Sequence, residues 1–103
     1  MAINTLYTLQ QTDEFEEWFH RLRDKTVKNR LLARLARAEN GHLGDVKTVD
    51  GALQELRMTF GGGLRIYFTI RGSQIILLLQ GGNKASQQRD IEKAKHLLAN
   101  FGD

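Results

Sequence analysis

The sequence predicts one α+β domain spanning residues 1–103: an N-terminal strand, a helical hairpin, a mainly antiparallel sheet and a C-terminal helix. A chain of 103 residues has the length of a single domain with one modest core. Apolar residues recur at helical spacing in residues 13–39 and 86–101, and they occupy every second position between residues 55 and 71. We expect the helices to pack on one face of the sheet, as is typical of α+β domains.

The N-terminal part of the chain predicts a strand and two helices. Thr5–Gln10 is short and rich in strand-forming residues. Asp13 is expected to cap a helix because Glu16 stands three residues later, and a second helix begins near Lys25. The two apolar faces carry Phe15, Trp18, Phe19 and Leu22, then Val27, Leu31, Leu32, Leu35 and Ala36. Asn40–Gly41 is a stop signal, and the short link between the helices predicts an antiparallel hairpin.

After a polar connector the hydrophobic period changes from 3.6 to 2, which predicts two half-buried strands. Their apolar positions are Leu56, Met58 and Phe60, then Leu64, Ile66, Phe68 and Ile70. Gly61–Gly63 and Gly72–Ser73 predict the turns, and Ile75–Leu79, apolar on both faces, predicts a strand inside the sheet. Gly81–Gly82 ends this strand. Ser86 is expected to cap a final helix whose apolar face carries Ile91, Ala94, Leu98 and Phe101.

Composition and charge exclude several classes of protein. A hydrophobic fraction of 41% and a charged fraction of 26% are typical of a folded globular domain. The chain has no cysteine, which excludes a disulfide scaffold and a thiolate nucleophile, and no apolar run is long enough for a membrane span. We therefore expect a cytoplasmic protein without a membrane partner. The net charge is +3, and seven Lys or Arg residues stand between residues 21 and 37 beside one acid, which favours a polyanionic partner.

The two alternating strands place polar side chains together on the face opposite the apolar one. Arg57, Arg65, Tyr67 and Thr69 are expected on this solvent-facing side. Arginine forks fit phosphate oxygens, and an aromatic ring beside them can stack on an unpaired base. Ordinary exposed strand residues would give the same pattern, so both interpretations stay open. Arg34 and Arg37 lie on a polar stripe of the second helix, which a solvated face would also explain.

The corner between the last strand and the last helix offers a second set of anion-binding groups. Residues 80–86 combine a helix N-terminus with Lys84. This is not a nucleotide-binding P-loop, because Asn83 and Ala85 flank the lysine where that motif needs Gly and Ser or Thr. A plain capped turn is the alternative. The histidines, His20, His42 and His96, have no metal-ligand spacing, so we expect neither a metal site nor a cofactor.

Several sequence blocks resemble those of a known toxin family. They are Gly-Asp-Val-Lys, Glu-Leu-Arg, Leu-Arg-Ile-Tyr-Phe and Gly-Gly-Asn-Lys-Ala-Ser-Gln-Gln-Arg-Asp-Ile within residues 43–94, with Phe-Glu-Glu-Trp near the N-terminus. The chain resembles the HigB-like "addiction module killer" toxins of the RelE/ParE superfamily. The resemblance implies a RelE-like fold, a cognate antitoxin that forms a hetero-oligomer with the toxin, and cleavage of mRNA on the ribosome without a metal.

The resemblance also suggests functional residues. It implies that Arg57, Arg65, Tyr67 and Lys84 are catalytic and that Lys47 binds RNA. The distribution of basic residues adds Arg34, Arg37 and Arg89 as expected RNA-binding residues. The guanidinium groups would stabilise the transition state at the phosphate. The general acid and base are not evident, because the chain lacks the histidine that some ribonuclease relatives have at the end of the sheet. Tyr67, Lys84 or Asp90 would have to serve, or the ribosome would supply most of the catalysis by positioning the RNA.

Two other functions remain open from the sequence. ParE-like members of the same superfamily poison DNA gyrase, and a shared fold does not identify the target. A non-catalytic module that docks nucleic acid on its basic face is the third possibility. The combination of Arg57, Arg65, Tyr67 and Lys84 favours the endoribonuclease.

Overall fold

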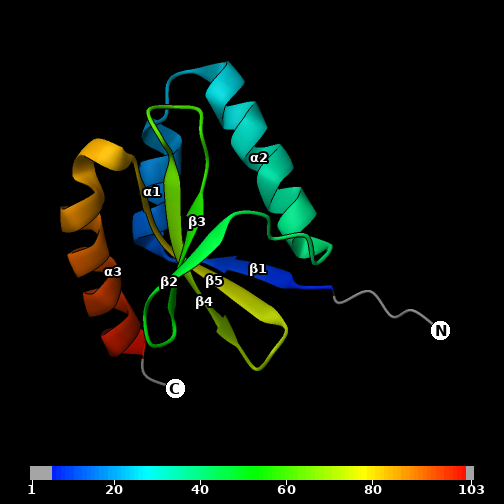
Figure 1. Ribbon diagram of the computed structural model, residues 1–103, viewed down its shortest axis with the longest axis vertical. Helices are drawn as coiled ribbons and strands as arrows, with labels where there is room; N and C mark the ends of the chain where they lie inside the picture. The colour runs from blue at the N-terminus through cyan, green and yellow to red at the C-terminus, as the bar shows by residue number, and fades with distance from the viewer. Residues whose placement is uncertain (1–5, 102–103) are drawn as a thin grey trace.

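The computed structural model describes residues 6–101, which form a five-stranded sheet with helices on both of its faces (Figure 1). The elements are β1 (Thr8–Gln11), α1 (Asp13–Arg21), α2 (Lys25–Glu39), β2 (Val46–Asp50), β3 (Leu53–Arg57), β4 (Arg65–Arg71), β5 (Ile75–Gly82), the 3-10 turn η1 (Lys84–Ser86) and α3 (Gln87–Phe101). The strand order is β1-β5-β4-β3-β2, with β1 parallel to β5 and every other pair antiparallel. The predicted α+β class is confirmed. The start of the predicted first strand, Thr5, lies outside the described residues.

Two separate cores cover the two faces of the sheet. One lies under α1 and α2 and contains Phe15, Leu31, Leu35, Leu56, Ile66, Phe68 and Leu78. The other lies under α3 and contains Leu53, Tyr67, Leu77, Leu79, Ala94 and Leu97. The expectation that all helices pack on one face is therefore wrong for α3. Because β5 is apolar on both faces, each face needs its own cover against water.

The first two helices begin at capping residues and run in opposite directions away from their connection (Figure 1). Thr12, and not Asp13 as expected, caps α1: its hydroxyl oxygen accepts from the backbone N–H of Phe15 at 3.0 Å. The same hydroxyl donates to the carbonyl of Leu79 at 2.7 Å, so the cap also ties α1 to β5. Asp24 caps α2 by accepting from two backbone N–H groups. The predicted helical hairpin is confirmed, although its two helices diverge.

The polar connector after α2 forms an edge strand that the alternation did not predict. In β2 the half-buried positions are Val46 and Val49, three residues apart. The register between β2 and β3 shifts between Thr48 and Asp50, so a bulge interrupts the period of two. The sequence also predicted that the next strand continues to Phe60. In the structure β3 ends at Arg57, and Phe60 lies in the turn that leads to β4.

The chain leaves β5 through the short turn η1 before α3 begins. Asn83 caps η1, and its side chain accepts from the backbone N–H of Ser86 at 3.2 Å. Ser86 was expected to be the cap of the last helix, but it ends η1 and turns its hydroxyl toward Asp90 on α3. Within residues 6–101 no helix has the length and apolar content that a membrane crossing requires.

Candidate functional site

Two arginines stand directly opposite each other at one end of the sheet. Arg57 ends β3 and Arg65 begins β4, and they are partners in the antiparallel register. Side chains at such positions project on the same face, with Cβ atoms about 4.5–5.5 Å apart. Like charges at this spacing repel each other, and an anion bound between them would relieve the repulsion. The arrangement is suited to a phosphate group, which two guanidinium forks can hold.

Asp45 and Lys84 border this arginine pair. The Asp45 Oδ1 atom lies 3.4 Å from Nη2 of Arg57, and the two side chains are 59% and 38% exposed. On the other side, Arg65 donates from Nη1 to the carbonyl of Gly63 at 2.6 Å. The backbone N–H of Lys84 donates to the neighbouring carbonyl in the same glycine turn at 3.2 Å. Asp45 thus lies beside Arg57, and Lys84 follows the turn that Arg65 contacts; both residues are exposed.

Glu55 holds the buried side of the site. Its side chain accepts a hydrogen bond of 2.8 Å from Nε2 of Gln87 on α3, and its Oε2 lies 3.6 Å from Nε of Arg65. The Arg65 side chain is 12% exposed and that of Glu55 only 2%. Carboxylates are rarely buried to this degree unless they are paired. Lys47, the register partner of Glu55 on β2, is exposed.

Tyr67 lies under α3 and is not accessible to a ligand. It has no exposed surface, and among residues 6–101 its hydroxyl has no hydrogen-bond partner of normal geometry. Burial and the nearby Glu55 carboxylate raise the pKa of Tyr67 well above its usual range, so the phenol stays neutral. The prediction of an open face is therefore wrong for Tyr67 and largely for Arg65. The same face carries Leu77 and Leu79, which α3 must cover.

Arg34, an expected RNA contact, also makes several contacts with the backbone of its own chain. Its guanidinium donates to the backbone carbonyls of Leu43 and Arg57 at 3.0 Å, and more weakly to that of Asp45 at 3.4 Å. Burial lowers its pKa, and the positive charge of Arg37 lowers it further. The donors of Arg34 are thus engaged in joining α2 to the connector and to β3. Arg37 is exposed on the same helix and stays a predicted RNA contact.

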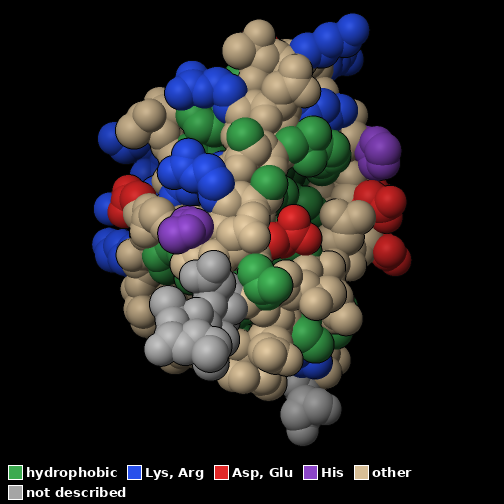
Figure 2. Space-filling model, turned by 90° about the vertical axis from the view of Figure 1, so that its right-hand side faces the viewer, with side chains coloured by type: hydrophobic (Ala, Val, Ile, Leu, Met, Phe, Trp, Pro, Cys, Tyr) green, Lys and Arg blue, Asp and Glu red, His purple; other side chains and the backbone are tan. Residues whose placement is uncertain are grey.

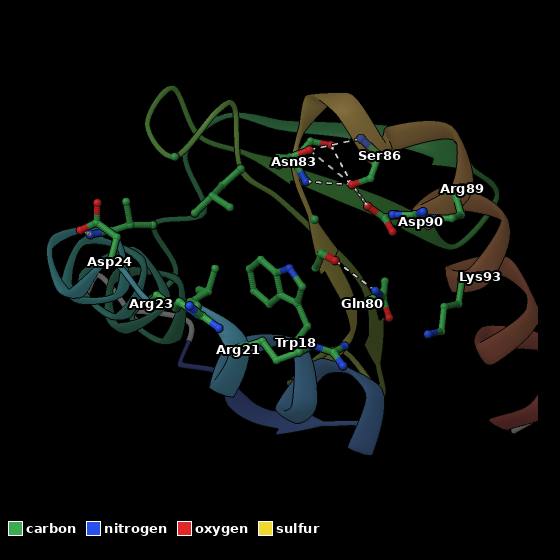
Figure 3. A pocket seen from close by; sticks show the side chains of 16 residues that line it. Trp18, Arg21, Arg23, Asp24, Gln80, Asn83, Ser86, Arg89, Asp90 and Lys93 are labelled. Carbon is green, nitrogen blue, oxygen red and sulfur yellow. Dashed lines mark hydrogen bonds between the residues drawn. The ribbon is translucent and has the colours of Figure 1, made fainter.

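A cleft of about 560 Å³ opens beside the arginine pair, between α1 and the start of α3 (Figure 3). Arg89, one of the predicted RNA-binding residues, lines it. Asp90 is 5% exposed and accepts a hydrogen bond from the hydroxyl of Ser86. It packs against Gly82, where any side chain would collide with its carboxylate. Gly82, which lines the cleft, is also the register partner of Arg65 on β4.

Sequence reasoning missed three residues of this region. Asp45 stood in a segment interpreted as a connector, and Trp18 was assigned to the core alone. Glu55 gave a usable signal, because it is the only acid between residues 51 and 89 and stands on a strand beside two basic ones. Its burial required knowing that α3 covers this face.

Basic side chains also extend over the surface outside the site. Figure 2 shows Lys and Arg side chains over the upper and left parts of one face, with hydrophobic side chains between them. This distribution agrees with the net charge of +3. Across the described part of the chain, no three His, Asp or Glu side chains come together as metal ligands would.

Comparison with known sequences identifies relatives along nearly the whole chain. A family model described as "Phage derived protein Gp49-like (DUF891)" matches residues 17–99. An uncharacterized protein of Haemophilus influenzae is 34% identical over 94 residues, which cover 91% of this chain and 95% of the relative.

Comparison with solved structures identifies toxins of similar fold. A mutant of the Escherichia coli toxin RelE in the free state has a TM-score of 0.64 at 14% identity, covering 85% of this chain and 97% of that one. The RelBE2 toxin–antitoxin complex of Mycobacterium tuberculosis has a TM-score of 0.53 at 19% identity, covering 79% and 94%. The intact E. coli RelBE complex has a TM-score of 0.57 at 12% identity, covering 75% and 95%. The expected RelE-like fold is confirmed.

Proposed function

Because the chain belongs to the Gp49-like family of phage-derived proteins and has the fold of the RelE toxins, we propose that it is the toxin of a toxin–antitoxin pair and that it cleaves translated mRNA. The cleavage would take place on the ribosome and would inhibit translation. Its place in the cytoplasm and its HigB-like character within the superfamily are parts of the same proposal.

The opposed pair Arg57 and Arg65 is the observation that supports this function best. Two like charges face each other across β3 and β4, and Nε of each arginine lacks a hydrogen-bond partner among residues 6–101. The repulsion between the two guanidinium groups costs the free protein stability, although each arginine also forms one ion pair, Arg57 with Asp45 and Arg65 with Glu55. It is suited to a group that carries more negative charge in the transition state than in the substrate, as the phosphate does during RNA cleavage.

The residues around the pair suggest how the reaction proceeds. The RNA 2′-oxygen attacks the adjacent phosphorus, the bond to the 5′-oxygen breaks, and a 2′,3′-cyclic phosphate and a 5′-hydroxyl result. The exposed carboxylate of Asp45, beside Arg57, is the candidate acceptor for the 2′-hydroxyl proton. The exposed ammonium of Lys84 is the candidate donor to the 5′-oxygen. Tyr67 drops out of the catalytic set because it is fully buried.

An antitoxin is the proposed physiological partner. Two of the structural relatives are toxin–antitoxin complexes by their descriptions. An acidic surface on the antitoxin would complement a toxin with a net charge of +3 and two arginines that face each other. Co-expression of the genes on either side should identify this partner by relief of growth inhibition.

Mapping of RNA ends in cells tests the proposed function. After brief induction, primer extension on abundant mRNAs should show new 5′ ends inside reading frames for the parent chain. Arg57→Ala should show none, and Lys95→Ala should cut like the parent, since Lys95 lies on α3 in an exposed ion pair with Asp50. A DNA-damage response without new RNA ends would overturn the proposal and favour a gyrase poison.

A further inference from the structure

The cleft between α1 and α3 contains the only tryptophan of the chain. Trp18 is half-buried and its indole lies near the centre of the cleft in Figure 3. One side of the ring packs against Gly81, where a Cβ atom would come within 2.3 Å of the indole. Phe15 supports it at a centroid distance of 5.5 Å. The indole is thus held in place from behind while part of it stays open to the cleft.

Four basic side chains without partners of their own line the cleft, two near Trp18 and two on the α3 side (Figure 3). They are Arg21, Arg23, Arg89 and Lys93, and none of them forms a salt bridge or side-chain hydrogen bond with another residue of the 6–101 segment. The two acids of the cleft are already engaged. Asp24 caps α2, and Asp90 accepts from Ser86. The charge that remains available to a ligand is therefore positive.

Gln80 supplies a buried polar atom without a partner. The residue is 7% exposed and lines the cleft, and its Nε2 donates to the carbonyl of Gly81 at 3.1 Å. Its Oε1 accepts no hydrogen bond from any described residue. A buried acceptor that is left unsatisfied costs free energy, so a ligand with an N–H group would gain by binding here.

We propose that this cleft binds one unpaired nucleotide of the RNA strand that is cut at the arginine pair. The base stacks on Trp18 and donates an N–H to Oε1 of Gln80, and its phosphate lies among the basic side chains. This inference rests on the proposed function, because the strand that is cut at the arginine pair has to supply the nucleotide; Gly82, which lines the cleft, is the register partner of Arg65. In this proposal Arg89 helps to position the RNA, and Trp18, Gln80 and Lys93 join it as RNA-binding residues.

Tryptophan fluorescence tests the cleft directly, since Trp18 is the only tryptophan of the chain. The probe is a short single-stranded oligonucleotide with 2′-O-methyl sugars, which binds but lacks the nucleophile for cleavage. Titration of the purified chain should quench the emission. Lys93→Ala should weaken binding severalfold and lower the slope of log K against log salt concentration by about 0.7, the value of one phosphate contact on a single strand.

Lys95→Ala is the matched control on the same helix. It removes the same charge two residues away from Lys93, outside the cleft, and should leave both the affinity and the salt slope as in the parent. Gln80→Leu keeps most of the volume, removes the acceptor and should also weaken binding. If the two lysine variants bind alike, or if the parent shows no quenching, the cleft is not an RNA site.

Two further measurements distinguish binding of an RNA strand from binding of a free nucleotide, and failure of the cleft from failure of the proposed function. AMP should quench only at much higher concentration than the oligonucleotide, and equal quenching by both would overturn the strand assignment in favour of a free nucleotide. Ribosome-dependent cleavage is measured on the same preparations. If the parent cleaves mRNA but its fluorescence is not quenched, the role of the cleft is wrong and the proposed function stands. If the oligonucleotide quenches the parent, Lys93→Ala weakens this binding and no mRNA is cleaved, the proposed function is wrong and the cleft remains an RNA-binding site.

Discussion

Arg34 and the pair Arg57–Arg65 use the same side chain in opposite ways. The guanidinium of Arg34 is surrounded by backbone carbonyls that need donors, and its bonds join three segments of the chain. The paired arginines instead face each other, and Nε of both lacks a hydrogen bond within the described residues. Arg34 thus has its guanidinium engaged by the backbone, whereas each paired arginine forms one ion pair and keeps an Nε donor for a ligand.

We expect this contrast to separate an arginine that only stabilises the fold from one that binds a ligand. All three belong to basic patterns that look alike in the sequence. The difference lies in whether acceptors of the protein itself bind the guanidinium N–H groups. N–H groups with such partners add stability, whereas N–H groups without them can bind a ligand. The predictions below follow this contrast, from the largest expected loss of stability to the smallest.

Arg65→Ala should destabilise the protein most. It leaves the Glu55 carboxylate buried without its cation, and removing one partner of a buried ion pair costs about 3–5 kcal/mol. At about 4–8 °C per kcal/mol, the Tm should fall by more than about 10 °C. Adding Glu55→Gln to Arg65→Ala should recover part of this loss in thermal melting. A single variant that melts like the parent would show that Arg65 is not needed to neutralise Glu55.

Arg34→Ala should cost about 2–3 kcal/mol, because it removes charged hydrogen bonds from half-buried carbonyls. Arg37→Ala on the same helix removes the same charge from an exposed position and should change stability by less than about 0.5 kcal/mol. Urea unfolding of both variants measures the difference. Equal midpoints would mean that the carbonyl contacts of Arg34 contribute nothing.

Arg57→Ala should change stability little. Its ion pair with Asp45 is exposed, and such pairs contribute about 0–1 kcal/mol. The variant also relieves the repulsion with Arg65, which offsets the lost contact. Melting curves should coincide with those of the parent within a few degrees, and a large loss would place Arg57 with Arg34 as a structural residue.

Tyr67→Phe should have the smallest effect at neutral pH, because the hydroxyl that it removes forms no hydrogen bond of normal geometry with a described residue. The folded-state pKa of Tyr67 is raised, so above pH about 10 the unfolded chain loses this proton while the folded chain keeps it. Stability of the parent should therefore fall as the pH rises beyond that value. The fall should be shallower in Tyr67→Phe, and identical pH profiles would contradict the raised pKa.

The sequence predicted most of the elements because their periods are regular. It missed β2 because the bulge near Thr48 breaks the alternation, and it placed α3 wrongly because alternation shows which residues share a face without showing what covers that face. A signal was present: Ile75–Leu79 is apolar on both faces, which requires cover on both.

The candidate site was predictable in part for a related reason. Arg57 and Arg65 share a face, as the period of two requires, and Lys84 follows at the rim. The burial of Tyr67 and the engagement of Arg34 depend on contacts between segments far apart in the chain. No local pattern contains such contacts.

Single-turnover cleavage of mRNA on purified ribosomes tests the arginine pair most directly. The parent chain and Arg57→Ala are compared at equal folded fraction, with Lys95→Ala as the control. If the pair acts in catalysis, Arg57→Ala should cleave about 10²–10³ times more slowly, which is the usual loss when one donor to developing transition-state charge is removed. The control should cleave at the parental rate. Cleavage by Arg57→Ala at the parental rate would contradict the assignment of the paired arginines to catalysis.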